Sequence, residues 1–351
     1  MSKSKRKVHP MKFIFYCVLF IVYVLVFPQN LNHFLFFSGI KSDLNAGTSS
    51  VVPFRSNSKI GYYDTNGSLL QSQTRLFNSS ISDEGYFNYD NLNDPPILYG
   101  LKKEHTINIQ KGYWPFILRD EILAINSEGT SLAKFSDEGS LIWESDFNSI
   151  ITFIKSTTSG YLLGLANGTL IINSDVDRKP LLSYAPGGSS IPILLGADFS
   201  LNKNRVIIIS GLNPQRLIIL EKRKSEYRPV YHEDLDSTFN REVFTKISRH
   251  SDWGFVEQND YILVIDMNNF EISELPFNGN IKDVRYNHKK SLFEVLSYND
   301  NNSIELSYYT KQFKKLGSLK QKIEGFFYDD INDIQYWGSD ESIGRMILLG
   351  E

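Results

Sequence analysis

Short apolar runs alternate with polar turn residues from about Lys59 to the C-terminus. Runs of apolar or β-branched residues recur, for example at 122–125, 161–165 and 205–209. Gly, Asn and Asp stand between these runs, and no long stretch repeats its apolar residues every 3.6 positions. Short runs of this kind, bounded by turn residues, are typical of β-strands. The pattern therefore predicts that residues 59–351 form an all-β succession of hairpins.

Four of the predicted turns share a weak internal repeat. Each has an Asn or Glu followed by Gly, then a small hydroxyl residue and the start of an apolar strand. The four copies are NGSLL at 66–70, EGTSL at 128–132, EGSLI at 138–142 and NGTLI at 167–171. Tight hairpin turns need residues that tolerate a positive φ, as Gly and Asn do. A repeated hairpin unit predicts a repeat architecture.

One copy extends into a longer motif. Residues 133–143 read AKFSDEGSLIW, in which an Ala-containing strand leads to the turn residue Gly139 and then to Trp143 four positions later. This segment resembles the repeat of quinoprotein-like (PQQ-type) β-propellers, and the later half of the chain resembles degenerate WD40-type blades. The resemblance implies a propeller in which Trp143 docks against the neighbouring blade. Partial copies of the motif begin at Ala124 and at Asp64.

The length of the chain fits a single propeller. Residues 59–351 provide about seven four-stranded blades at ~40–45 residues per blade, and six longer blades fit nearly as well. Such a ring leaves no long free strand edge. Two β-sandwiches are the alternative, with the charged segment 221–236 as the boundary between them.

The N-terminus carries a separate signal. Residues 1–12 hold five Lys or Arg and no acidic residue, and residues 13–28 are uncharged. This apolar segment is slightly shorter than the ~20 residues of a typical spanning helix. It predicts one transmembrane signal anchor, with a cleaved secretory signal as the alternative, although no small-residue cleavage site follows.

The charge bias predicts the orientation of this anchor. The basic tail 1–12 stays in the cytoplasm, and the bulk of the chain is extracytoplasmic. Residues 29–58 are expected to form a flexible linker to the propeller domain at 59–351. Cys17 is the sole cysteine, so no intrachain disulfide can form. A translocated domain without disulfides favours the bacterial periplasm and the inner membrane.

The charge balance narrows the classes of partner. With 37 basic and 40 acidic residues the net charge is −3, which is unlike a nucleic-acid-binding protein. The longest basic run is Lys222–Arg223–Lys224, between two glutamates. We therefore expect no nucleic-acid partner. The net acidic domain outside the membrane is also not expected to lie flat on anionic lipid.

No motif in the chain defines a catalytic centre. The six histidines are dispersed, and His232–Asp236 is interpreted as a solvated loop rather than a cation site. The segment 299–305 resembles a calcium loop but lacks its central Gly, so it predicts a hairpin turn. Each of the four Trp is expected to pack between blades. We accordingly predict no catalytic, metal-binding or cofactor-binding residue, and no cofactor.

These features predict a non-catalytic protein-binding scaffold held at the membrane. Its expected partners are other envelope or membrane proteins and the lipid bilayer, which residues 13–28 enter. The propeller resemblance implies a component of a cell-envelope assembly. An alternative is a hydrolase or lyase acting on glycan or peptide, in which acids from several blades converge at the axis. A small-molecule sensor is a third reading, although twelve cytoplasmic residues leave no room for an output domain.

Overall fold

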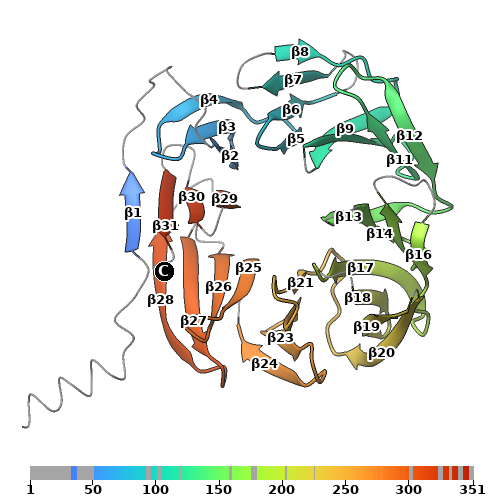
Figure 1. Ribbon diagram of the computed structural model, residues 1–351, viewed down its shortest axis with the longest axis vertical. Coiled ribbons are helices and arrows are strands. Elements are labelled where there is room, and N and C mark those ends of the chain that lie inside the picture. Colours follow the sequence, from blue (N-terminus) through green and yellow to red (C-terminus); the bar gives the residue numbers. More distant parts are fainter. Residues whose placement is uncertain are drawn as a thin grey trace, which may run out of the picture.

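The strands form eight sheets arranged as a ring around one axis (Figure 1). The structure, a computed structural model, describes residues 33–37, 51–91, 96–100, 104–118, 120–157, 160–174, 180–201, 204–224, 226–277, 279–299, 303–322, 327–331, 334–338 and 343–347. Seven sheets have four strands and one has three. All pairings within the sheets are antiparallel, and each sheet is one blade of a β-propeller.

The first four blades follow each other along the chain. Blade 1 comprises β2 (Val51–Arg55), β3 (Lys59–Asp64) and β4 (Leu69–Thr74). Blade 2 comprises β5 (Asn78–Ile81), β6 (Gly85–Tyr89), β7 (Ile97–Gly100) and β8 (Glu104–Thr106). Blade 3 comprises β9 (Tyr113–Leu118), β10 (Glu121–Asn126), β11 (Ser131–Phe135) and β12 (Leu141–Asp146). Blade 4 comprises β13 (Ile151–Thr157), β14 (Gly160–Leu165), β15 (Leu170–Ser174) and β16 (Pro180–Tyr184).

The other four blades complete the ring. Blade 5 comprises β17 (Ile191–Phe199), β18 (Arg205–Leu212), β19 (Gln215–Arg223) and β20 (Glu226–Leu235). Blade 6 comprises β21 (Thr245–Ile247), β22 (Trp253–Glu257), β23 (Tyr261–Asp266) and β24 (Ile272–Pro276). Blade 7 comprises β25 (Asn280–Asn287), β26 (Leu292–Asn299), β27 (Ser303–Thr310) and β28 (Lys315–Lys322). Blade 8 comprises β29 (Phe327–Ile331), β30 (Ile334–Gly338), β31 (Ile343–Ile347) and, as its fourth strand, β1 (His33–Phe37).

The ring has eight blades rather than the seven expected from length, because the repeats are shorter than assumed. The start of β5 at residue 78 and that of β9 at residue 113 are 35 residues apart. Turns such as Asn66–Gly67 and Asn167–Gly168 reverse the chain within a few residues, with φ of 91° and 84° at their glycines. Tight turns and short strands therefore leave room for an additional blade.

Two strands lie within residues 29–58, which the sequence predicts as a flexible linker. β1 pairs with β31 over five residues, from His33 opposite Ile347 to Phe37 opposite Ile343. β2 pairs with β3 in blade 1. The propeller therefore begins before Lys59, and its last blade joins both ends of the chain. The apolar run at 34–37 supplies a strand edge, which the polar character of the surrounding segment conceals in the sequence.

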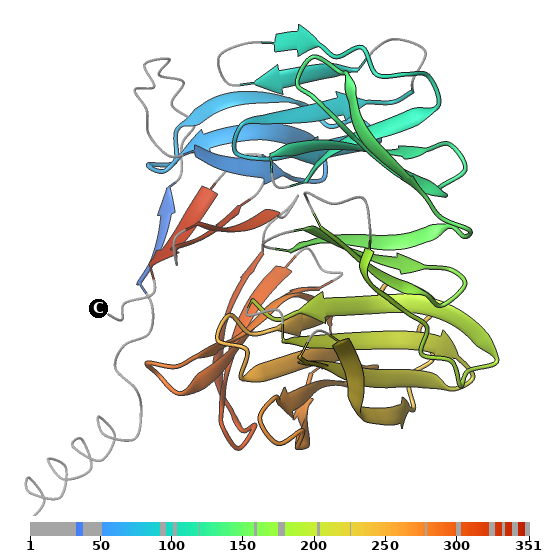
Figure 2. The same cartoon turned by 45° about the vertical axis from the view of Figure 1, so that its right-hand side comes forward.

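The core consists of apolar clusters between neighbouring blades. Leu195 and Ile207 of blade 5 pack with Val256 and Ile265 of blade 6. Similar clusters join blades 2 and 3, 3 and 4, 4 and 5, and 6 and 7. Figure 2 shows neighbouring blades side by side around the ring. Burial between sheets, with about 25 cal/mol per Å² of apolar area removed from water, is thus the main stabilising contribution.

The docking role expected of Trp143 is confirmed. Trp143 lies on the outermost strand of blade 3, and its ring is 6.0 Å from that of Tyr161 in blade 4. Trp114 stacks on Tyr89 of blade 2, and Trp253 contacts Phe293 of blade 7 edge to face. Three of the four Trp therefore contact a neighbouring blade, while the side chain of Trp337 lies outside the described residues.

Several sequence-based expectations concern other segments. The proposed sandwich boundary at 221–236 forms parts of β19 and β20 within blade 5, which supports one ring over two domains. The predicted tail and anchor, residues 1–12 and 13–28, lie outside the described residues, as do residues 300–302 of the predicted 299–305 turn. Within the part of the chain that the structure describes, no helix is long and apolar enough to cross a membrane.

Candidate functional site

The innermost strands of four consecutive blades carry a row of alternating charges. Lys155 lies on β13, Asp198 on β17, Lys246 on β21 and Asp283 on β25. These strands surround the axis of the ring (Figure 1). The row places acids and bases of several blades on the strands that line the axis. An enzyme with its site at the axis would use groups of this kind, so the contacts that they make bear on whether the geometry suits catalysis.

Each member of the row binds a group of another blade. Lys155 Nζ donates a hydrogen bond to the carbonyl oxygen of Thr245 at 2.8 Å, and the main-chain N–H of Ile247 donates to Asp198 Oδ2 at 2.6 Å. Lys246 forms an ion pair with Asp283 across blades 6 and 7. The Asp198 and Lys246 contacts join neighbouring blades, 5 to 6 and 6 to 7, whereas the Lys155 contact reaches from blade 4 to blade 6. Their direct effect is to hold the innermost strands of blades 4–7 together.

Burial shifts the titration of the two central groups. It lowers the pKa of Lys155, and the nearby carboxylate of Asp198 opposes that shift. Burial also raises the pKa of Asp198, while the charge of Lys155 and the N–H of Ile247 favour its ionised form. The opposite charges and the donated hydrogen bond thus oppose desolvation without outweighing it at either group. Lys155 and Asp198 each have a main-chain partner in blade 6, so both side chains take part in contacts between blades.

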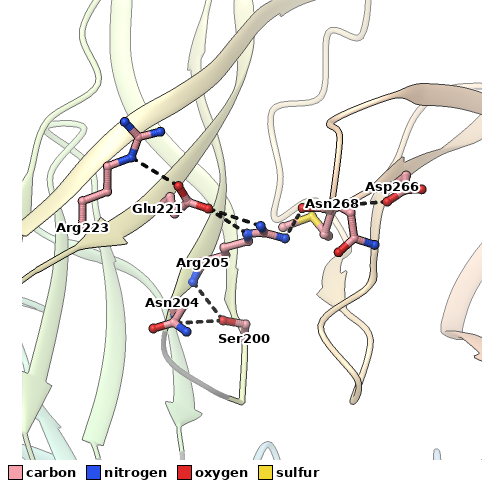
Figure 3. A network of polar contacts seen from close by, with 8 residues as sticks. Ser200, Asn204, Arg205, Glu221, Arg223, Asp266 and Asn268 are labelled. Carbon is pink, nitrogen blue, oxygen red and sulfur yellow. Dashed lines mark hydrogen bonds and ion pairs between the residues drawn. The ribbon is translucent and has the colours of Figure 1, made fainter.

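An arginine joins blades 5 and 6 farther from the axis (Figure 3). Arg205 at the start of β18 contacts Glu221 of β19 at 3.2 Å and donates to the carbonyl oxygen of Met267 in blade 6. Its guanidinium also lies over the ring of Phe270, 5.4 Å from the centroid. Glu221 in turn pairs with Arg223. A planar guanidinium with several donors suits such a multiple contact, and Arg205 acts as a bridge between the hairpins of two blades.

Local turns hold this bridge in place. The hydroxyl of Ser200 accepts hydrogen bonds from the N–H groups of Asn204 and Arg205, at 3.2 and 2.9 Å. In blade 6, the carboxylate of Asp266 accepts from the N–H of Asn268 at 2.8 Å (Figure 3). Short polar side chains that bind the backbone a few residues away are what fix such turns.

The polar cluster His232–Asp236 is not the solvated loop expected from its composition. Residues 232–235 belong to β20, the outermost strand of blade 5, where His232 pairs opposite Ile218. Asp234 forms an ion pair with Arg216 at 3.1 Å. Among the described residues, no group of three or more His, Cys, Asp or Glu has a geometry that could hold a metal ion.

One candidate surface was not predicted from the sequence. In four-stranded blades the innermost strand of each blade starts on the same face of the ring, because an even number of antiparallel strands brings the chain back to it. We call this the start face, and the opposite one, where the innermost strands end, the end face. Exposed large apolar side chains stand at the starts of four consecutive innermost strands; they are Phe77, Trp114, Ile150 and Ile191.

These four residues, the apolar arc, differ from the other exposed apolar residues in their placement. Phe77 is 86% exposed, and the other three are between 37 and 55% exposed. Six large apolar residues elsewhere in the described residues are between 37 and 58% exposed; they are Ile97, Leu141, Ile142, Leu181, Leu201 and Leu316. Trp114 is held by its stack on Tyr89, and the main-chain N–H of Phe77 donates to Asp90 Oδ1 at 3.0 Å. Single exposed apolar residues are common, so it is the position of these four at the starts of successive innermost strands, on one face of the ring, that makes them a candidate contact surface. In the sequence each is one apolar residue at or next to a strand start, with no local sign of its exposure.

Comparison with known proteins agrees with this architecture. A family model described as a beta-propeller protein matches residues 2–351. The chain belongs to this β-propeller family. A relative in Treponema pallidum (strain Nichols), itself uncharacterized, is 20% identical over 255 residues, which cover 72% of this chain and 67% of the relative.

Two solved structures resemble this β-propeller protein in fold. The crystal structure of BamB from Moraxella catarrhalis superposes with a TM-score of 0.58 at 10% identity, covering 89% of this chain and all of BamB. The computationally designed Ika8 protein gives a TM-score of 0.59 at 13% identity, covering 88% of this chain and 98% of the design. At these identities the likeness establishes the fold alone. It agrees with the propeller fold that the resemblance of residues 133–143 implies.

Proposed function

We propose that this β-propeller protein is a membrane-anchored, extracytoplasmic scaffold that binds another envelope or membrane protein through the apolar arc. The exposure of Phe77, Trp114, Ile150 and Ile191 at equivalent blade positions is the observation that carries the proposal. Protein interfaces are enriched in aromatic residues at their centre, and Phe77 and Trp114 offer such anchors. The fold shared with BamB and the propeller resemblance support a place in an envelope assembly.

The charged row at the axis favours a scaffold over an enzyme. Asp198 and Asp283 each contact a lysine or a main-chain donor of a neighbouring blade. An acid/base pair for glycan or peptide hydrolysis needs carboxyl groups that face a substrate, with pKa values set apart for their two roles. Groups engaged in joining blades are suited to rigidity, and a rigid disc presents the apolar arc with little loss of entropy on binding.

Site-specific photocross-linking in cells tests the interface. A photoreactive amino acid placed at position 77 or 150 should give one discrete adduct, while the same group at exposed Leu316 on β28, away from the start face, should not. The adduct formed from position 77 should be lost when Ile150 is changed to Ser, because both contact one partner. Equal adducts from Leu316, or persistence in Ile150→Ser, would contradict the proposal.

The membrane topology needs its own test. A reporter that is active only outside the cytoplasm, fused after Glu351, should be active if residues 13–28 anchor the chain with its tail inside. Alkaline extraction of membranes should leave the protein in the pellet. An inactive reporter would contradict the extracytoplasmic location, and release of the protein by extraction would contradict the anchoring. In either case the cross-linking experiment would still test the apolar arc.

A further inference from the structure

We infer that the end face of blades 6 and 7 is a basic surface that rests on the anionic headgroups of the membrane holding the protein. The inference rests on the proposed membrane anchoring and adds to it an orientation of the ring. Three of the four end-face hairpins of blades 6 and 7 make up the surface: 248–252 in blade 6, and 288–291 and 311–314 in blade 7. Each joins strands that meet on the end face. The fourth, 267–271, carries one acidic residue, Glu271, and no Lys or Arg.

Charge is concentrated on the three hairpins of the surface despite the net acidity of the chain. They carry five Lys or Arg and a single acidic residue, Asp252; the five are Arg249, Lys289, Lys290, Lys311 and Lys314. All five are exposed except Lys290, which is half-buried. Asp252 is occupied within the surface, since it contacts His288 Nε2 at 3.1 Å and accepts from Ser248 Oγ at 2.6 Å. The surface as a whole therefore presents positive charge outward.

Contacts between side chains hold the three hairpins together. The rings of His250 and His288 are 4.4 Å apart, which joins blade 6 to blade 7. Lys311 Nζ lies 5.4 Å from the centroid of the Tyr286 ring, and Phe313 stacks on Phe293 at 5.4 Å. The basic residues thus belong to one packed surface rather than to independent loops.

Two end-face hairpins on the far side of the ring are acidic. Hairpins 82–84 of blade 2 and 136–140 of blade 3 carry four acidic residues and no Lys or Arg; they are Asp83, Glu84, Asp137 and Glu138. Figure 1 shows blades 2 and 3 across the ring from blade 7. A negatively charged membrane would attract one edge of this face and repel the other, which specifies a tilt rather than flat adsorption.

The path of the chain brings the basic edge to the membrane. β1 runs antiparallel to β31 as the fourth strand of blade 8, so it begins on the end face. Blade 8 is next to blade 7 in the ring (Figure 1). Only residues 29–32 separate His33 from the predicted anchor at 13–28, and four extended residues span at most about 14 Å. The start of β1 therefore lies near the bilayer, with the basic hairpins beside it and the start face turned away.

This arrangement differs from the expectation that a net acidic domain avoids an anionic membrane. Screening limits the relevant charges to those within about 10 Å of the lipid at 0.1 M salt, so the local surface outweighs the distant acids. It also leaves the apolar arc, on the start face, free to meet a partner from the periplasmic side.

To test this inference, the full chain is placed in lipid nanodiscs, and the distance from a fluorophore on the protein to the lipid headgroups is measured by quenching. Cys17→Ala removes the sole cysteine, and Gln312→Cys then carries a fluorophore on the basic surface, with Glu128→Cys as the start-face control. Quenching by headgroup spin labels should be at least about twofold stronger for position 312 in discs containing phosphatidylglycerol than in discs of pure phosphatidylcholine, because surface lysines are attracted to anionic lipid. Position 128 should show weak quenching in both.

A matched pair of variants assigns the effect to the surface. Lys311→Glu/Lys314→Glu should reduce quenching at position 312 to the level of neutral lipid, as should raising salt. Lys320→Glu/Lys322→Glu makes the same charge change toward the other end of β28 and should leave quenching unchanged. Equal quenching in both lipids, or equal effects of the two variants, would overturn the inference while the protein stays embedded. Failure of the chain to co-purify with discs would instead refute the anchoring, and the inference with it.

Discussion

Blades 4–7 and blades 1–3 are joined by different chemistry. Around blades 4–7, charged groups make contacts between blades: Asp198 and Arg205 of blade 5 bind blade 6, and Lys155 of blade 4 also reaches blade 6. In blades 1–3 two of the crossing contacts are made by hydroxyls: Tyr62 donates to the carbonyl oxygen of Ser82, and Tyr89 to that of Pro115, both at 2.8 Å. A charged group that crosses there, Arg55, is exposed and donates to the carbonyl oxygen of Ser79 at 2.6 Å. One ring thus combines joints whose loss leaves a buried charge with joints whose loss leaves a neutral polar group.

The largest loss of stability is expected where a buried charge is left without its counterpart. Asp198→Ala removes the carboxylate beside Lys155 and the acceptor of the Ile247 N–H, and should lower the free energy of unfolding by about 3 kcal/mol. Urea unfolding followed by tryptophan fluorescence measures it. Asp234→Ala in the same blade is the control; its carboxylate is 65% exposed, so its pair with Arg216 should contribute at most about 1 kcal/mol. Equal losses would remove the distinction between buried and exposed charges.

A close approach of two backbones should produce the next largest effect. A Cβ at Gly196 of β17 would lie 2.6 Å from the carbonyl oxygen of Val243 and 2.8 Å from Thr245 Oγ1. Gly196→Ala should therefore destabilise the junction of blades 5 and 6 by about 2 kcal/mol. A Cβ at Gly317 meets nothing within 4 Å, so Gly317→Ala should change the midpoint of thermal unfolding very little. If Gly196→Ala does not lower the stability, blades 5 and 6 can move apart at this contact without a loss of free energy.

The hydroxyl joints of the other region should contribute less. Tyr62→Phe leaves the carbonyl oxygen of Ser82 without this donor and should cost about 1 kcal/mol. Tyr309→Phe in blade 7 removes a longer contact, 3.4 Å to the carbonyl oxygen of Pro276, and should cost less. Chemical denaturation of both variants measures the difference. A loss for Tyr62→Phe as large as that for Asp198→Ala would erase the contrast between the two regions.

The smallest expected effect concerns pH. The hydrogen bond from Lys315 lowers the pKa of Glu305. In the window between this lowered pKa and the ordinary value of about 4.3, the unfolded chain binds more protons, so stability falls as the pH falls through it. Glu305→Gln should flatten this slope slightly, by less than about 1 kcal/mol in total. Unfolding measured between pH 3 and pH 6 tests it, and an unchanged slope would show that other carboxylates carry the acid sensitivity.

Much of the fold could be predicted from local signals. The turn at Glu138–Gly139 and the Trp143 that follows predicted a docking contact that the structure contains. Strands such as 261–265 were marked by their apolar runs, because a strand covered on both sides by neighbouring blades is apolar throughout. The number of blades was not predictable in this way, since it depends on repeat lengths that vary with each turn.

Contacts that depend on the closed ring had no local signature. β1 was hidden because its pairing with β31 joins positions more than 300 residues apart, from His33 to Ile347. The apolar arc was not predicted, because an exposed Phe77 looks the same in sequence as a buried one. The basic hairpins were not predicted either, because each contributes only one or two Lys or Arg and only the ring places them together.

The pairing of β1 with β31 has a consequence for biosynthesis. β1 is the first of the described strands in chain order, and it completes a sheet whose other members are the last three. Contacts so distant in sequence form late and slowly. Blade 8 therefore cannot close until residues 343–347 have been synthesised, and until then the edge of β1 is open to unwanted pairing. Truncation anywhere before residue 343 would leave β1 without its partner strand and blade 8 incomplete.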